Sequence, residues 1–143
     1  ALHFDNVEPP SAAEAEALLR LVIAALDASP APRFEWPAVS RVIDAEQLAP
    51  LLNVSVSSLK RYASGERDTP DEVAARLHHV ALIIGDLAGA YNEVGVRRWF
   101  ERKRSALDGR APAALLSGDW NPDAALPQKV RELARSLVAL GAT

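Results

Sequence analysis

The sequence contains no cysteine among its 143 residues, which excludes disulfide bonds and thiolate metal sites. It also has no apolar run approaching the ~18 residues of a membrane span, because Arg20, Asp27 and Asp86 interrupt the best candidates. The first residues show no basic stretch followed by an apolar one, so we expect no signal peptide there. These absences suit a cytoplasmic protein without membrane contact, which is the location that we expect.

Aromatic residues make up only 6% of the chain, whereas alanine and leucine are abundant. This composition favours helices, and an apolar content of 49% is enough to build a core. The net charge of −3 argues against a protein that coats DNA non-specifically. Positive charge is nevertheless concentrated in the middle, since residues 51–110 carry ten bases and eight acids, whereas residues 1–50 carry three bases and eight acids.

The sequence also lacks the common catalytic motifs. It has no P-loop, no glycine-rich dinucleotide loop, no nucleophile elbow and no zincin motif. His78 and His79 are adjacent on a predicted helix, so their side chains diverge by about 100° and share a metal poorly. A surface or helix-packing role suits them better. We therefore expect no metal, no cofactor and no catalytic residues, and an enzyme is the least favoured hypothesis.

The N-terminal part predicts a loose arm followed by a helix. Residues 1–10 end in two prolines, and Ser11 with Glu14 forms a capping-box pattern. The helix should end near Asp27, before the proline-rich residues 29–32. Its apolar face would contain Leu18, Leu19, Val22, Ile23 and Leu26. Phe34 and Trp36 follow in a connector, where we expect both to be core anchors.

The rest of the chain predicts further helices and no strand, so the expected fold is an all-α helical bundle. A short helix is expected over 37–42, and Asp44 should cap the next one. Thr69-Pro70-Asp71-Glu72 is a strong helix start, with Thr69 as the cap. The expected helices span 45–52, 56–63, 70–91, 96–102, 112–117 and 127–139.

Residues 45–62, AEQLAPLLNVSVSSLKRY, have the pattern of a helix-turn-helix. Ala49 is small where the second helix would cross the first, and Asn53 tolerates the positive φ that the tight turn needs. Ser55 can cap the second helix, and Gly65 can end it. The buried faces would contain Leu48, Leu52, Val54, Leu59 and Tyr62, leaving Val56, Ser57, Lys60, Arg61 and Ser64 pointing outward.

These outward residues suit the major groove of DNA. Arg61 can pair with guanine or grip a phosphate, Ser57 can bond to either, and Val56 can touch a thymine methyl group. Lys60 and Arg67 are better phosphate partners. The alternative is that these are two ordinary helices with a solvated outer face, but the small residue, the turn residue, the core spacing and the local charge agree on DNA binding.

Two resemblances to known families overlap this pattern and extend it. Residues 45–62, with Gly65 and Thr69-Pro70 after them, resemble the helix-turn-helix of Xre/Cro-type repressors. From Val96, the sequence VRRWFERKRSALDGRAPAALLSGD resembles the C-terminal domain of Xre/MbcA/ParS antitoxins. The matching residues are Trp99-Phe100, Ala106-Leu107, Gly109, Pro112, Leu115-Leu116 and Gly118. Trp120-Asn121-Pro122 interrupts the family pattern as a local insertion.

The resemblance implies three segments and a function. Residues 1–38 would form an N-terminal arm and helix, 39–92 the DNA-binding domain and 93–143 a small helical toxin-binding domain. The chain would be the antitoxin of a type II toxin–antitoxin system. It would repress its own operon by binding operator DNA, and it would bind and neutralise a RES-domain toxin that degrades NAD. The alternative is a stand-alone transcriptional regulator that uses residues 93–143 for dimerisation.

If the chain is an antitoxin, as the resemblance implies, the last predicted helix would lie nearest the toxin. The toxin-binding residues would be Lys129, Arg131, Arg135, Leu137 and Val138. The apolar stripe of residues 130–138 has an alternative role, packing against Trp99, Phe100 and Leu116 of the same chain. We also expect a homodimer or a larger hetero-oligomer with toxin, because one short recognition helix offers few phosphate contacts. Leu18, Leu19, Val22 and Ile23 are candidates for the dimer contact, or for the protomer's own core.

A basic run precedes the glycine and proline residues of the second resemblance. It consists of Arg97, Arg98, Arg102, Lys103 and Arg104. Three roles are possible for this run: it is a solvated helix end, it contacts DNA phosphates, or it pairs with an acidic partner.

Overall fold

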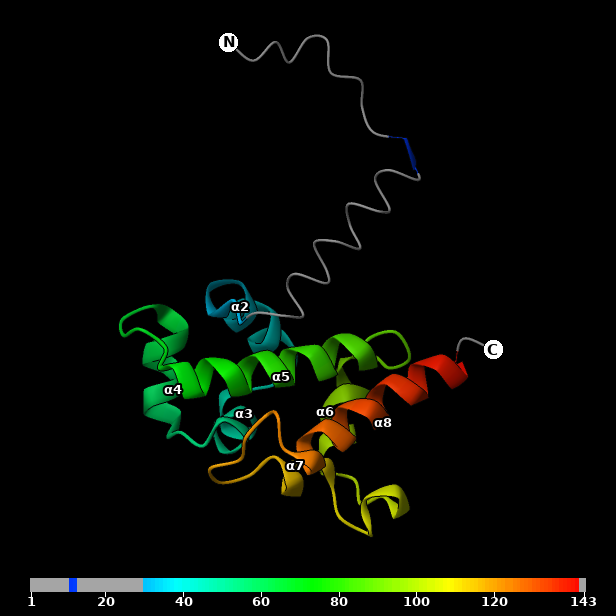
Figure 1. Cartoon of the computed structure of the whole chain (residues 1–143). Coiled ribbons are helices and arrows are strands. Elements are labelled where there is room, and N and C mark those ends of the chain that lie inside the picture. The colour runs from blue at the N-terminus through cyan, green and yellow to red at the C-terminus, as the bar shows by residue number, and fades with distance from the viewer. Residues whose placement is uncertain (1–10, 13–29, 142–143) are drawn as a thin grey trace.

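The structure of the chain is a computed structural model that describes residues 11–12 and 30–141, with side chains only as far as residue 137. Within these residues every regular element is helical, which confirms the predicted all-α class (Figure 1). The α-helices are α2 (Pro32–Val42), α3 (Ala45–Leu52), α4 (Val56–Ser64), α5 (Asp71–Leu87), α6 (Glu93–Glu101), α7 (Pro112–Leu115) and α8 (Ala125–Gly141), and a 3-10 helix, η2, covers Ser105–Leu107. The helix predicted between Ser11 and Asp27, with its apolar face, lies almost entirely outside the described residues, as does the arm 1–10.

Helix α5 is the centre of the bundle. Helices α2 and α8 pack along it, α3 contacts both α4 and α5, and α7 contacts both α6 and α8 (Figure 1). Apolar residues cover most of the circumference of α5, as is typical of a helix surrounded by others. Its buried residues are Val73, Ala74, Arg76, Leu77, His79, Val80, Ile83, Ile84 and Leu87.

One hydrophobic core runs through both sides of the expected boundary between residues 92 and 93. Leu48 and Leu52 of α3 belong to the same buried cluster as Trp99 and Phe100 of α6 and Val130 of α8. The segments 39–92 and 93–143 therefore share their packing in the described part of the chain. No helix among the described residues combines the length and apolar character that a membrane span requires.

The bounds of α3 and α4 agree to within one residue with those predicted from the sequence, but α2 begins five residues before the expected start at Pro37. Pro32 occupies the first turn, where a proline costs no hydrogen bond, and Pro37 lies inside the helix. The Glu35 carboxylate accepts a hydrogen bond from the Ala31 backbone N–H at 2.8 Å, which stabilises this earlier start.

The connector prediction was right for Trp36 and wrong for Phe34. Both residues lie on α2, where Trp36 is 3% exposed and Phe34 is 70% exposed. Side chains two positions apart on a helix point about 200° apart, so they cannot share one buried face. The guanidinium of Arg33 lies 5.8 Å from the ring centre of Phe34.

The predicted Thr69 cap was also wrong. Pro70 is the capping residue of α5 and no side chain caps the helix. The Thr69 hydroxyl instead accepts a hydrogen bond from the indole N–H of Trp36 at 2.9 Å, so it joins α2 to the start of α5. Helix α5 ends at Leu87, and Tyr91 lies beyond it.

The C-terminal helices were predicted at the right places with shifted ends. Helix α6 begins at Glu93 rather than Val96, because the Asn92 side chain accepts a hydrogen bond from the Gly95 N–H at 2.8 Å and caps it. Helix α7 ends at Leu115 rather than at residue 117, and α8 begins at Ala125 rather than at residue 127.

Candidate nucleic-acid interface

The two helices α3 and α4 are held by the side-chain caps that the sequence predicts. The Asp44 carboxylate accepts a hydrogen bond from the Gln47 N–H at 2.8 Å, and the Ser55 hydroxyl accepts one from the Ser58 N–H at 3.1 Å. Each cap satisfies an N–H that has no partner within its own helix. The start of α4 is therefore fixed by local chemistry rather than by packing alone.

The turn between these helices has the predicted geometry. Asn53 adopts φ 55° and ψ 45°, the left-handed conformation that asparagine tolerates better than most residues. The Val54 N–H then donates to the Ala49 carbonyl at 3.1 Å, which closes the turn. Ala49 is buried, as expected for the small residue at the contact between the two helices.

The inner side of α4 rests on the core. Leu59 is buried, and Val54, Val56 and Tyr62 pack against the same cluster while half-exposed. The expectation that Val56 points outward is therefore only partly met, because part of its side chain is used in packing. The other predicted DNA-binding residues, Ser57, Lys60, Arg61, Ser64 and Arg67, are all exposed.

The end of α4 keeps Arg67 close to the helix. Gly65 has φ 81° and ends α4 in the left-handed conformation, as predicted. The Arg67 N–H donates to the Arg61 carbonyl at 3.2 Å, and the Ser64 hydroxyl donates to the same carbonyl at 3.1 Å. Glu66 is exposed in the same turn, so the charge around this end of the helix is mixed.

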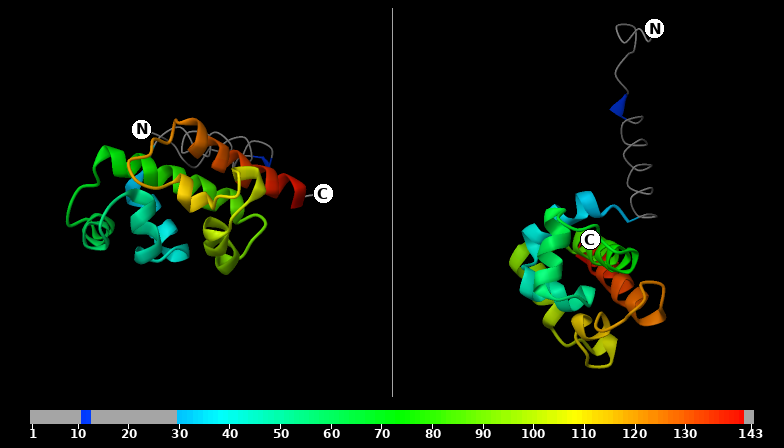
Figure 2. Two further views of the ribbon diagram at one scale, coloured as in Figure 1. Left: turned by 90° about the horizontal axis from the view of Figure 1, so that it is seen from below. Right: turned by 90° about the vertical axis from the view of Figure 1, so that its left-hand side faces the viewer.

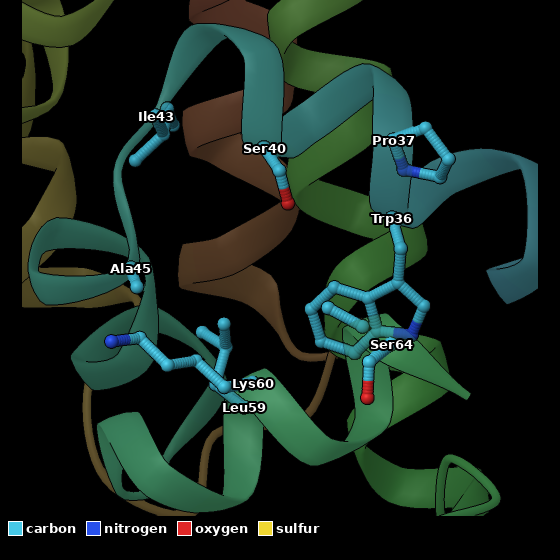
Figure 3. Close-up of a pocket in the computed structure, with 9 residues that line it drawn as sticks. Trp36, Pro37, Ser40, Ile43, Ala45, Leu59, Lys60 and Ser64 are labelled. Atoms are coloured by element: carbon cyan, nitrogen blue, oxygen red, sulfur yellow. The ribbon is translucent and has the colours of Figure 1, made fainter. Parts of the chain in front are cut away.

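A shallow hollow of about 380 Å³ lies between α2 and α4. Figure 3 shows its lining, with Ser40 on the α2 wall and Lys60 on the α4 wall. Its deepest residues, Trp36, Ile43 and Leu59, are almost fully buried, so they offer little free surface to a ligand. The residues that line the hollow pack against α4, and the hollow is open to solvent rather than an enclosed cavity.

The predicted toxin-binding residues on α8 divide into exposed and packed ones. Lys129 is exposed, and the Arg131 and Arg135 Nε atoms lie 3.9 and 3.7 Å from Oδ2 of Asp86 on α5. Leu137 is half-buried against the core, and the Val138 side chain lies outside the described part of the chain. Val130 and Ala134 of the same stripe are fully buried, so part of this stripe packs within the chain.

The basic run at the end of α6 and in the residues after it also has both packed and exposed members. The Arg97 guanidinium donates to the Val42 carbonyl at 3.1 Å, and the Arg104 guanidinium stacks 5.0 Å from the ring centre of Trp99. Burial lowers the pKa of Arg104, although arginine remains cationic. Arg98, Arg102 and Lys103 are exposed. Two members of the run are therefore structural, and three face solvent.

The sequence reasoning missed the role of Trp120, which it assigned to an insertion. Trp120 is buried, and its indole N–H donates to the Leu51 carbonyl in α3 at 2.8 Å. The buried guanidinium of Arg76 donates to the Trp120 carbonyl at 2.9 Å and to the Asp119 carboxylate. The loop before α8 is thereby attached to both α3 and α5. A tryptophan beside a Gly-Asp turn was the only local signal for this role.

The two adjacent histidines take the helix-packing role rather than a surface role. His78 Nδ1 donates to the Glu35 carboxylate at 2.6 Å, which joins α5 to α2. His79 Nε2 donates to the Pro127 carbonyl at 2.9 Å, and its ring meets the edge of Trp120. Burial lowers the pKa of His79 below its usual value. Nowhere in the described ranges do three or more possible metal ligands gather.

Comparison of the chain with family models, with characterised proteins and with solved structures gave no match.

Proposed function

We propose that this chain is a DNA-binding antitoxin that represses its own operon through α4 and neutralises a RES-type toxin through residues 93–143. The observation that carries the DNA-binding part is the outer face of α4. Ser57, Lys60, Arg61 and Ser64 are exposed there, on a helix whose start is capped by the Ser55 side chain and that follows a left-handed turn. A rigid helix with a polar, cationic face is the element that such regulators insert into the major groove.

The dimensions of α4 suit this role. Nine residues at 1.5 Å each give a helix about 13 Å long, and its diameter of about 10–12 Å with side chains fits a major groove about 12 Å wide. Arg61 would pair with guanine, and Ser57 would bond to a base edge or a phosphate. Lys60 and Arg67 would contact phosphates on either side. Val56 would add only its exposed part to contact with a thymine methyl group.

Two copies of the chain are needed for tight binding under this proposal. The α4 region offers Lys60, Arg61 and Arg67 as cations, and few phosphate contacts give weak affinity at physiological salt. A dimer that presents two copies of α4 one helical turn of DNA apart would double the contacts. We therefore propose a homodimer, or a larger hetero-oligomer when toxin is bound.

The antitoxin part rests on the resemblance of residues 96–118 to the Xre/MbcA/ParS C-terminal domain. Lys129 and the half-exposed Arg135 remain available on α8 for a partner that binds a phosphate-bearing dinucleotide. Arg131 and Leu137 would contribute less, because both are packed against the rest of the chain. A stand-alone regulator would have the same α4 but no toxin.

Co-expression with the product of the adjacent reading frame tests the whole proposal. An antitoxin should form a complex that survives gel filtration and should restore growth to cells in which the neighbour alone is toxic. Footprinting should show protection of DNA upstream of the chain's own gene. A protected operator without any complex would support the stand-alone regulator. The absence of both a protected operator and a complex would contradict the whole proposal.

A further inference from the structure

A second group of cations lies outside α4, on α6 and the loop that follows it. Arg98, Arg102, Lys103 and Arg110 are exposed, and we call these four residues the basic ridge. None of them makes a side-chain hydrogen bond or ion pair within the described ranges. Their neighbours Arg97 and Arg104 are engaged with Val42 and Trp99.

The loop that carries the ridge is rigid. The Arg104 N–H donates to the Arg110 carbonyl at 3.1 Å, and the Gly109 N–H donates to the Arg104 carbonyl at 2.9 Å. Asp108 and Gly109 both have positive φ, at 55° and 78°, and Leu107 anchors the loop in the core. A preformed loop loses little conformational entropy when it binds a partner. The backbone that carries Arg102, Lys103 and Arg110 is therefore preorganised for binding.

The ridge is also tied to the α3–turn–α4 unit. The Gln47 side chain at the start of α3 donates to the Arg97 carbonyl at 3.0 Å, and Arg97 in turn donates to the Val42 carbonyl at 3.1 Å. Figures 1 and 2 show α4, α3 and the loop around η2 in a row along one side of the molecule, away from α8. The ridge therefore lies on the same side of the molecule as α4.

We propose that the basic ridge is a second phosphate-contacting surface, which grips the DNA backbone beside the segment that α4 reads. This inference rests on the proposed function. Between Arg98 and Arg110 five cations stand against only two acids, Glu101 and Asp108, and arginine is suited to phosphate. Double-stranded DNA supplies a continuous row of phosphates, as an extended row of cations requires. The position of the ridge on the same side as α4 favours DNA over an acidic protein.

The test measures the salt dependence of binding to a duplex of about 24 base pairs taken from the protected DNA upstream of the chain's own gene, which is long enough for two half-sites. Arg102→Ala combined with Lys103→Ala removes two cations of the ridge. Lys129→Ala combined with Arg135→Ala removes two cations from α8 and is the matched control. Circular dichroism should first show that both variants keep the helical content of the wild type.

The ridge variant should reduce the magnitude of the slope of log affinity against log salt by about 0.9 for each lost phosphate contact, which is about 1.8 for each protomer and about 3.6 for a dimer on two half-sites, and the control should leave it unchanged. An unchanged slope in the ridge variant, while Arg61→Ala still weakens binding, would overturn the inference and leave the proposed function standing. Loss of toxin binding alone would assign the ridge to an acidic partner and would also overturn it. No binding by the wild type would contradict both proposals.

Discussion

The indole N–H of Trp120 donates a 2.8 Å hydrogen bond to the backbone carbonyl of Leu51, 69 residues earlier in the chain. Leu51 lies in the last turn of α3, where carbonyl groups have no partner within the helix. The loop before α8 therefore completes the end of the helix that precedes the proposed recognition helix. Through this bond, the C-terminal part of the chain takes part in positioning the proposed DNA-binding surface.

Replacement of this tryptophan should be costly. Trp120→Phe leaves the buried Leu51 carbonyl without its donor, so the free energy of unfolding should fall by about 1–3 kcal/mol. Trp36→Phe is the matched control, because it also removes an indole N–H, but its acceptor is the half-exposed Thr69 hydroxyl, which water can reach. The control should lose about 0.5–1.5 kcal/mol in the same urea titration. An equal or smaller loss for Trp120→Phe would show that the Leu51 contact contributes little.

The turn between α3 and α4 depends on the conformation of Asn53. Because its φ is 55°, Asn53→Gly should be tolerated, whereas the β-branched Asn53→Val should reduce the free energy of unfolding by about 1–2 kcal/mol. Ser57→Val, an exposed position within α4, is the control for adding a β-branched residue. Thermal unfolding of the three variants measures the difference. Equal melting temperatures for the Gly and Val variants at position 53 would contradict this account of the turn.

Acid should destabilise the fold through His79. Burial holds its pKa in the folded chain below the 6.5 expected when unfolded, so the unfolded chain binds more protons in the window below pH 6.5. Stability is therefore present above pH 6.5 and falls as the pH falls through that window. The loss between about pH 7.5 and about pH 5.5, measured by denaturant unfolding, should be smaller in His79→Gln. The same loss in both proteins would exclude His79 as its source.

Helix α8 should be needed for folding as well as for any partner. Deletion from Pro127 onward removes Val130 and Ala134 from the core and the carbonyl that pairs with His79, so the truncated chain should lose cooperative unfolding. Lys129→Glu changes only an exposed residue, so it should keep stability within about 0.5 kcal/mol while weakening protection against the toxin. Full protection by Lys129→Glu would remove this residue from the toxin surface. A truncated chain that still unfolds cooperatively would contradict the core role of α8.

The sequence predicted best where the signal is local. The bounds of α3 and α4 follow from Asp44, Asn53, Ser55 and Gly65, each of which acts on backbone groups within a few residues. The exposed face of α4 follows from the same spacing. Only Val56 departs from it, because the edge of the core extends beneath the first turn of α4.

Long-range partners explain most of what the sequence did not predict. Thr69 fits a helix cap by its position, yet its hydroxyl pairs with Trp36, 33 residues away. Trp120 looks like part of an insertion because its partners, Leu51 and Arg76, lie 69 and 44 residues away. No local pattern reports such pairs. They appear only when the helices are packed around α5.

The most direct test of the central claim is a fluorescence-anisotropy titration of DNA from upstream of the chain's own gene with the wild type, Arg61→Ala and Lys129→Ala. Both variants remove one exposed cation, from α4 and from α8 respectively. If α4 reads the DNA, Arg61→Ala should weaken binding by about 1–3 kcal/mol, and Lys129→Ala should match the wild type. Wild-type affinity in Arg61→Ala, or the same loss in both variants, would contradict the claim that α4 is the recognition helix.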